Sequence, residues 1–293
     1  MTRNGISEGA EDILRIDRNG KICSSEKNGL KRNFPFRLGT TSYIVEDNLV
    51  ANAGFLGPLV DDIELVLFEW NGISNIPDKE TVKSLLRLKE EHSITYTVHM
   101  TPDTELGSPD EIVRKRSTEK CLEIIKLTAP LDPFAYIIHF HGEMRGRKPV
   151  RNIPQWLESL DASAGRLLES GLDPEMLCIE TLDYPYELIE PVVNRHGMSI
   201  CLDAGHLVFF GYSLGGYLDR YLPRTRVIHL HGHCDGMDHK DIGTLEPEVL
   251  EILTEHAGFG DDRERILTLE IFGLPDFERS MEVMGRLYRR KTL

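Results

Sequence analysis

The sequence predicts one α/β domain of the (β/α)8 barrel type, a TIM barrel, with a short N-terminal extension. From residue 37 onward, short apolar runs alternate with longer segments of helical period. Eight such units occupy about 255 residues, which is the usual size of this barrel. Neither G-x-G-x-x-G nor G-x-x-x-x-G-K-[ST] follows the first run, which argues against a doubly wound open sheet.

The apolar runs are the predicted strands. They span 37–44, 63–69, 94–99, 134–141, 176–180, 198–203, 226–231 and 266–270. The segments between them carry apolar residues at helical spacing, and several have Pro in the first turn. These predicted helices span 78–91, 109–127, 156–168, 186–195, 247–256 and 275–287, with weaker helical patterns at 48–60 and 214–221.

Residues 1–33 are polar and poor in large apolar side chains, so we expect the barrel to occupy 34–293. The Asn19-Gly20 pair favours a type I′ turn, which would make a short hairpin of residues 13–23. A disordered tail is the equally weighted alternative.

Composition excludes several classes of protein. The 293 residues include 34 Lys and Arg against 48 Asp and Glu, giving a net charge of −14. This balance argues against a nucleic-acid partner, and no apolar run is long enough for a membrane span. The N-terminus does not resemble a signal peptide. Five scattered cysteines are typical of reduced thiols, so we expect a cytoplasmic protein.

Ionisable residues end seven of the eight predicted strands. In chain order these are Glu69, His99, His139 or His141, Glu180, Asp203, His229 with His231, and Glu270. Because the carboxyl ends of barrel strands meet at one mouth, these side chains are expected to converge there. So many carboxylates would repel one another unless cations lay among them.

Two further pairs extend this set. His206 lies in the same loop as Asp203, and Asp238-His239 follows the turn-rich run after the seventh strand. His, Asp and Glu without Cys suit Zn²⁺, Mn²⁺ or Fe²⁺. At four to five ligands for each ion, the set would serve two or three divalent ions. The candidate ligands are His99, His139, Glu180, Asp203, His206, His229, Asp238, His239 and Glu270.

Over roughly residues 36–290 the ordered ligand set resembles the xylose isomerase-like barrel superfamily, which includes apurinic endonucleases that hold three zinc ions. Longer phrases resemble a narrower family, the cobamide-remodelling phosphodiesterases. Its members hydrolyse the phosphoribosyl bond in the nucleotide loop of cobamides, the vitamin B12 class of cofactors. The phrases are RLGTTSYI, VDDIELVLFE, TYTVH, LGSPD, TAPLDPFAYIIH, CLDAGHL and PRTRVIHLHG.

The endonuclease resemblance implies three metal positions. The first matches His99, His139 and Glu180; the second matches Glu180, Asp203, His229 and Glu270; the third matches His206, Asp238 and His239. In the endonuclease pattern one residue separates the last Asp and His, whereas here they are adjacent. Asp241 is therefore an alternative ligand at the third metal position. His141 competes with His139, since both point to the same face of their strand.

The resemblance implies metal-assisted phosphodiester hydrolysis with a cobamide as the small-molecule substrate. Cations would neutralise the phosphate oxygens and activate a water, which Glu270 or Glu180 would orient or deprotonate. Substrate contacts are expected from Tyr43, Glu69, His141, Arg145 and His231. Glu69 could instead pair with a base such as Arg37. The loop 207–217, rich in Phe, Tyr and Gly, could pack on a planar ligand or on neighbouring helices.

Three rival functions remain. A sugar isomerase or epimerase would use Glu180 and Glu270 on either side of a substrate carbon, with one metal ion. An apurinic endonuclease would bind abasic DNA, which the acidic charge disfavours. A non-catalytic corrinoid-binding protein would need no metal cluster. Metal stoichiometry separates the first rival from phosphoester hydrolysis.

Overall fold

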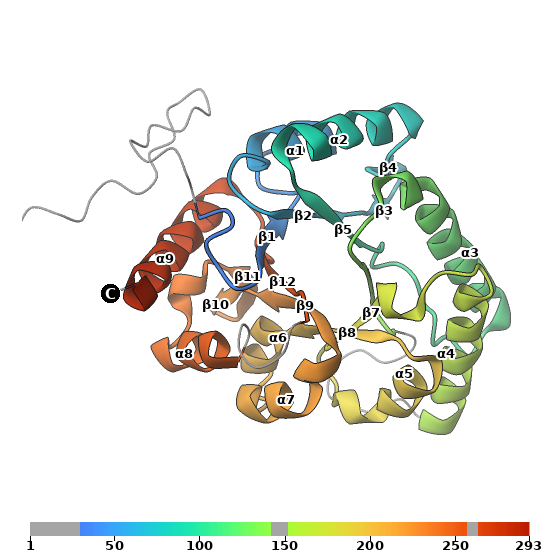
Figure 1. Ribbon diagram of the computed structural model, residues 1–293. Helices are drawn as coiled ribbons and strands as arrows, with labels where there is room; N and C mark the ends of the chain where they lie inside the picture. Colours follow the sequence, from blue (N-terminus) through green and yellow to red (C-terminus); the bar gives the residue numbers. More distant parts are fainter. Residues whose placement is uncertain (1–29, 142–151, 257–262, 293) are drawn as a thin grey trace, which may run out of the picture.

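The computed structural model describes residues 30–141, 152–256 and 263–292. Eight parallel strands close into a barrel in the order β1-β12-β9-β8-β7-β6-β5-β2, with helices forming the outer ring (Figure 1). The predicted (β/α)8 fold is therefore confirmed. The barrel strands are β1 Arg37–Thr41, β2 Asp62–Val66, β5 Thr95–His99, β6 Tyr136–Ile138, β7 Leu177–Glu180, β8 Ser199–Asp203, β9 Thr225–Leu230 and β12 Ile266–Leu269.

Each predicted helix has a counterpart, which in one case is split between a 3₁₀ turn (186–188) and the short helix α5. The helices are α1 Leu49–Leu56, α2 Lys79–His92, α3 Glu111–Thr128, α4 Ile153–Leu168, α5 Glu190–His196, α7 Leu214–Tyr221, α8 Pro247–His256 and α9 Leu274–Thr292. Several begin at a side-chain cap, as α2 does where Asp78 accepts from Thr81 N–H. None of the described helices is long and apolar enough to cross a membrane.

Three small elements follow strand ends and surround the mouth. The hairpin β3 (Glu69–Trp70) and β4 (Ile73–Ser74) follows β2, and the hairpin β10 (Gly232–Cys234) and β11 (Met237–Lys240) follows β9. A one-and-a-half-turn helix, α6 (Ala204–Phe209), follows β8 directly. The second barrel strand thus ends at Val66, and the prediction that it extends to Glu69 is wrong.

Period-two alternation explains how the barrel interior is layered. Cys178 and Glu180 share one face of β7, while Cys201 and Asp203 share one face of β8. The lower members belong to a small apolar cluster in which both cysteines are fully buried. The acidic members lie one layer nearer the strand ends. An apolar floor therefore supports a polar layer at the mouth.

Residues 30–33 of the predicted extension lie against the barrel. Lys31 Nζ donates to the carbonyls of Gly57 (2.8 Å) and His92 (2.6 Å), and the Arg32 N–H donates to the Asp61 carboxylate. The expected hairpin at 13–23 and the predicted contact residue Arg145 lie outside the described residues.

Candidate metal centre

Glu180 lies at the centre of the mouth. It ends β7, it is fully buried, and its Oε2 lies 2.8 Å from His139 Nε2 and 3.3 Å from His99 Nε2. One ligand atom from each of these three residues falls within 4.8 Å of the others. The structure thus brings together the three residues of the first predicted metal position. His141 lies beside them, its ring 4.9 Å from that of His139.

The second predicted position is also assembled. Glu180, Asp203, His229 and Glu270 each offer a ligand atom within 4.8 Å of the others, and all four residues are buried. His229 Nδ1 lies 3.0 Å from Glu270 Oε2 and 3.9 Å from Glu180 Oε1.

Buried acceptor atoms without hydrogen bonds indicate that the second cluster could hold a cation. Glu180 Oε1, Asp203 Oδ2, His229 Nδ1 and Glu270 Oε2 are all buried, and within the described chain none makes a hydrogen bond. Each has an ionisable neighbour, the nearest being His206 Nδ1 at 2.6 Å from Asp203 Oδ2. Burying such acceptors without a hydrogen bond is still costly, and three of them carry negative charge when ionised. A divalent cation among these four atoms would remove that cost, so the residues fit a metal ion.

The third position differs from the expected ligand set. His206 Nε2 lies 4.0 Å from Asp238 Oδ2, and His239 Nδ1 lies 3.0 Å from Asp238 Oδ1. The mutually close ligand atoms here come from His206, His231 and His239. His231, expected to contact substrate, is fully buried, with Nε2 3.3 Å from Asp203 Oδ1.

Asp241, the alternative ligand at the third metal position, accepts hydrogen bonds from groups outside the third cluster. Its Oδ2 accepts from Arg279 Nε at 2.8 Å, and its Oδ1 accepts from the Gly243 N–H at 3.0 Å. Oδ2 therefore anchors this loop to α9, and Oδ1 caps the short turn at 242–244. The structure therefore places this carboxylate on Arg279 and not among the mutually close ligand atoms of the third cluster.

Opposite charges in the cluster shift its pKa values strongly. Burial alone would lower the pKa of His99, but the Glu180 carboxylate outweighs it and raises the pKa to about 9. Burial likewise opposes ionisation of Asp203, yet His206 and His231 lower its pKa to about 2. For Glu270, burial is outweighed by His229, which holds the pKa well below its usual range. The cluster thus favours ionised carboxylates, which are the form that binds metal.

The expected ligand set lacks two residues of the cluster: Cys201, which offers a ligand atom close to Glu180 and His229, and Glu64. This fully buried side chain projects from β2, and its Oε2 lies 2.9 Å from His229 Nε2. The signal was a carboxylate inside an apolar run, two residues after Asp62 and therefore on the same face of the strand. Because Glu64 does not end its strand, the pattern of ionisable residues at strand ends does not identify it.

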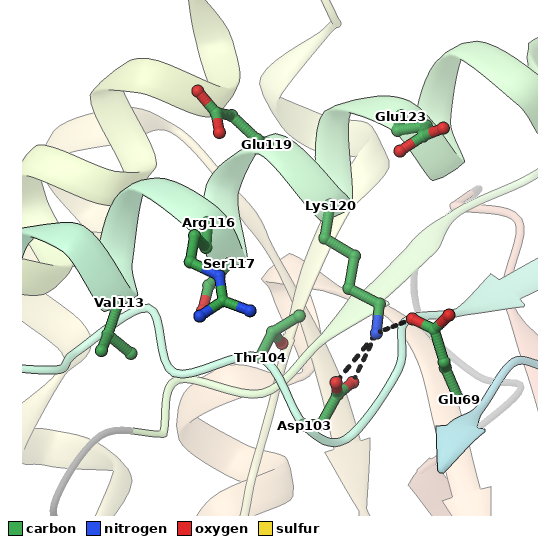
Figure 2. A pocket seen from close by; sticks show the side chains of 9 residues that line it. All are labelled: Glu69, Asp103, Thr104, Val113, Arg116, Ser117, Glu119, Lys120 and Glu123. Carbon is green, nitrogen blue, oxygen red and sulfur yellow. Dashed lines mark hydrogen bonds and ion pairs between the residues drawn. The ribbon is translucent and has the colours of Figure 1, made fainter. Parts of the chain in front are cut away.

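Glu69 lies outside the cluster. Its side chain is exposed and pairs at 2.8 Å with Lys120, which also binds Asp103 at 2.8 Å (Figure 2). Because β2 ends three residues earlier, the expectation that Glu69 ends a barrel strand is wrong. Pairing with Arg37 is wrong too, since Arg37 begins β1 at the other end of the barrel and binds Glu264.

The Lys120 contacts nevertheless connect elements around the mouth. They join the β3–β4 hairpin to α3 and to the loop after β5, beside a pocket that Arg116 and Ser117 also line (Figure 2). Of the other expected contact residues, Tyr43 is half exposed at the mouth, with its ring 6.1 Å from that of Phe272. The loop 207–217 is largely helical, and its Tyr217 packs on Tyr221.

Comparisons with known proteins agree with this architecture. A probable endonuclease 4 from Sulfurihydrogenibium sp. (strain YO3AOP1) is 28% identical over 173 residues, covering 51% of this chain and 60% of the relative. The match thus spans less than two thirds of that protein.

Solved structures share the fold at low identity. A D-tagatose 3-epimerase-like protein superposes with a TM-score of 0.69 at 20% identity, covering 88% of this chain and 100% of its own. D-psicose 3-epimerase from Clostridium cellulolyticum gives 0.62 at 16% identity, covering 86% and 99%. Endonuclease IV from Thermus thermophilus gives 0.61 at 19% identity, covering 87% and 99%.

The neighbours thus include both epimerases and endonucleases. The xylose isomerase-like TIM barrel family itself matches residues 50–286, which is most of the chain. This protein therefore belongs to the xylose isomerase-like TIM barrel family.

Proposed function

We propose that this protein is a metal-dependent phosphodiesterase that hydrolyses the phosphoribosyl bond in the nucleotide loop of cobamides. One observation carries the proposal. Three groups of potential ligands adjoin one another at the mouth, with Glu180 shared between the first two. That arrangement suits two or three cations around one phosphate group better than a single ion.

Divalent cations bound here would neutralise charge on the phosphate oxygens and lower the pKa of a water. A side chain of the protein would then accept the proton that the attacking water releases. Glu270 and Glu180 are buried carboxylates at the second cluster, and either lies close enough to its centre to accept a proton from the attacking water. His99 and His139 hold Glu180 in place through contacts of 3.3 and 2.8 Å. His229 Nδ1 lies 3.0 Å from Glu270 Oε2.

Exposed apolar side chains around the mouth support a large substrate. Within the described chain, six large hydrophobic residues are exposed, and five of these lie in connections that leave strand ends at the mouth: Tyr43, Trp70, Ile73, Met237 and Phe272. We call these five residues the mouth rim. Contiguous exposed apolar groups commonly mark a binding site. Two parts of the rim are contiguous, since Trp70 pairs with Ile73 and the ring of Tyr43 contacts that of Phe272.

The rim is continuous with the metal cluster on one side. The Phe272 ring lies 5.2 Å from that of His239 and 6.1 Å from that of Tyr43. A single sugar ring is too small to need such a rim, whereas a corrin macrocycle presents a broad face. The rim and the sequence phrases together support a cobamide as the substrate.

The direct test uses metal-replete protein incubated with adenosylcobalamin, followed by mass analysis of the products. We expect cobinamide phosphate and a free riboside in equal amounts. An intact cobamide after incubation with either Zn²⁺ or Mn²⁺ would reject the proposal. Binding without cleavage would favour a non-catalytic corrinoid-binding protein.

A sugar epimerase is the second candidate. The Glu180–Asp203–His229–Glu270 cluster alone could hold one ion. The D-tagatose 3-epimerase-like protein and D-psicose 3-epimerase share the fold. Elemental analysis of purified protein separates the two functions. One ion for each chain favours the epimerase, and two or three favour phosphodiester hydrolysis.

A further inference from the structure

Glu64 reaches across the barrel interior to His229. It projects from β2, whereas His229 lies on β9, and these strands are separated in the sheet by β1 and β12. Glu64 Oε2 lies 2.9 Å from His229 Nε2, and both side chains are fully buried. This contact can therefore form only when the barrel closes.

The chemistry of the two groups fixes where the proton lies. An ionised carboxylate only accepts hydrogen bonds, so Nε2 of His229 must be the donor. The other ring nitrogen, Nδ1, is buried, makes no hydrogen bond within the described chain, and lies 3.0 Å from Glu270 Oε2. We propose that Glu64 is a positioning residue that holds His229 with Nε2 protonated, so that Nδ1 is the atom that binds a divalent cation in the second cluster.

A second histidine of the cluster is oriented by the same logic with a different partner. His99 Nδ1 lies 2.9 Å from the carbonyl oxygen of Met100, which can only accept. Nδ1 is therefore a donor, and Nε2, which faces Glu180 at 3.3 Å, is the nitrogen left to bind a cation once the cation displaces its proton. A backbone carbonyl therefore orients one imidazole, and the Glu64 carboxylate orients the other. Such outer partners commonly set the tautomer and basicity of ligating histidines.

Direct metal binding by Glu64 is the competing role. Glu64, His99 and Glu270 also offer ligand atoms within 4.8 Å of one another, and Glu64 Oε1 is buried without a hydrogen bond in the described chain. The two roles differ in what a glutamine would preserve. A Gln oxygen still accepts from Nε2–H, but it is a poor substitute for a ligating carboxylate.

The first experiment measures Zn²⁺ affinity by chelator competition in Glu64→Gln and Glu64→Ala. We expect Glu64→Gln to stay within about threefold of the parent and Glu64→Ala to lose about 10- to 100-fold. Equal losses of Zn²⁺ affinity in both variants would identify Glu64 as a metal ligand. No loss of affinity in either variant would show that Glu64 has no role in metal binding. Either result overturns the proposal. Asp62→Asn is the matched control, because Asp62 is a fully buried carboxylate on the same face of β2 that binds Thr95 at 2.7 Å.

The second experiment reads the tautomer directly, first in the unsubstituted protein. In Zn²⁺-loaded protein, the ¹⁵N shifts of His229 should identify a protonated Nε2 and a metal-bound Nδ1. Glu64→Gln should retain this pattern at the same Zn²⁺ occupancy. Metal bound at Nε2 in the parent protein would overturn the proposal. Neither readout depends on which reaction the enzyme performs.

Discussion

One carboxylate oxygen of Glu180 lies 2.8 Å from Nε2 of His139, while the other, Oε1, makes no hydrogen bond within the described chain. The first oxygen faces the histidines of the first cluster, and the second faces His206 at 3.4 Å and His229 of the second cluster at 3.9 Å. Glu180 can therefore serve two neighbouring metal positions at once. The side chain is held by a strand end and by its burial, which leaves it little freedom to choose another partner.

Glu180→Gln is expected to abolish metal-dependent activity while leaving the fold intact. The amide keeps the shape of the side chain but loses the charge that two cations would share, so activity should fall by about 100-fold or more. Turnover and metal content are measured together. His99→Ala and Glu270→Ala should behave similarly, and Glu158→Gln, at an exposed position on α4, serves as the control. Unchanged turnover in all three site variants would exclude the cluster from catalysis.

Metal affinity should rise with pH up to about 9. In the metal-free protein, nearby carboxylates outweigh burial and raise the pKa of His99 and of His239 to about 9. A cation must displace these protons, so apparent affinity should increase about tenfold per pH unit for each proton released. Chelator competition between pH 6 and 9 tests this expectation. A flat profile would mean that the histidines are already neutral before metal binds.

The free energy of unfolding of the metal-free protein should fall as the pH rises from 6.5 to 9. A histidine whose pKa is raised on folding contributes stability that is complete below its unfolded value of 6.5 and is lost as pH rises through about 9. Asp62 adds to the trend, because burial raises its pKa to about 7 and its ionisation then opposes folding. Urea unfolding at pH 6.5 and 9 in the presence of chelator should therefore give a lower stability at pH 9. Asp62→Asn should reduce the difference, and equal stabilities at the two pH values would contradict this account.

Asp238 and Asp241 should respond differently to the same substitution. Asp238→Asn should weaken the third metal position, because Asp238 lies within 3.0–4.0 Å of His239 and His206. Asp241→Asn should leave metal content unchanged and cost at most about 1 kcal/mol through its partly exposed pair with Arg279. Elemental analysis and thermal unfolding measure the two effects. Loss of metal from Asp241→Asn alone would restore it as a ligand.

Truncation of the mouth rim should weaken substrate binding more than it slows turnover. Trp70→Ala and Phe272→Ala remove exposed rings, and we expect KM for a cobamide to rise about tenfold with a smaller change in kcat. Ile112→Ala is the matched control, since this exposed residue belongs to the first turn of α3 in the outer ring. A fall in kcat alone would place the rim in the chemistry and remove it from binding.

Gly205 leaves room for a histidine, and this predicts a sensitive site. A Cβ at this position would lie 2.5 Å from three atoms of the His231 ring, which itself approaches Asp203. Gly205→Ala should therefore displace the ring and reduce metal affinity. Gly215→Ala, where a Cβ would meet nothing within 4 Å, is the control. Equal metal affinities in the two variants would mean that His231 can move without consequence.

The amino-acid sequence determined the fold class and most of the cluster. Strand and helix periodicity is local, and parallel barrel strands bring their carboxyl ends together by topology, so an ionisable residue at a strand end predicts its own neighbours. His99, Glu180, Asp203, His229 and Glu270 could be placed in this way because each ends, or nearly ends, its strand.

Only the tertiary structure decided the contacts that depend on closure and on loop conformation. The Glu64–His229 pair joins strands that are not neighbours, so no local pattern in β2 reveals its partner. Glu69 lies outside the cluster because the chain forms a hairpin after β2, and Lys120 binds it from α3. His231 belongs to the third cluster because the β10–β11 hairpin brings His239 back over it, with ring centres 4.2 Å apart. Periodicity specifies which face a side chain occupies, whereas its partner across the barrel is fixed by shear and closure.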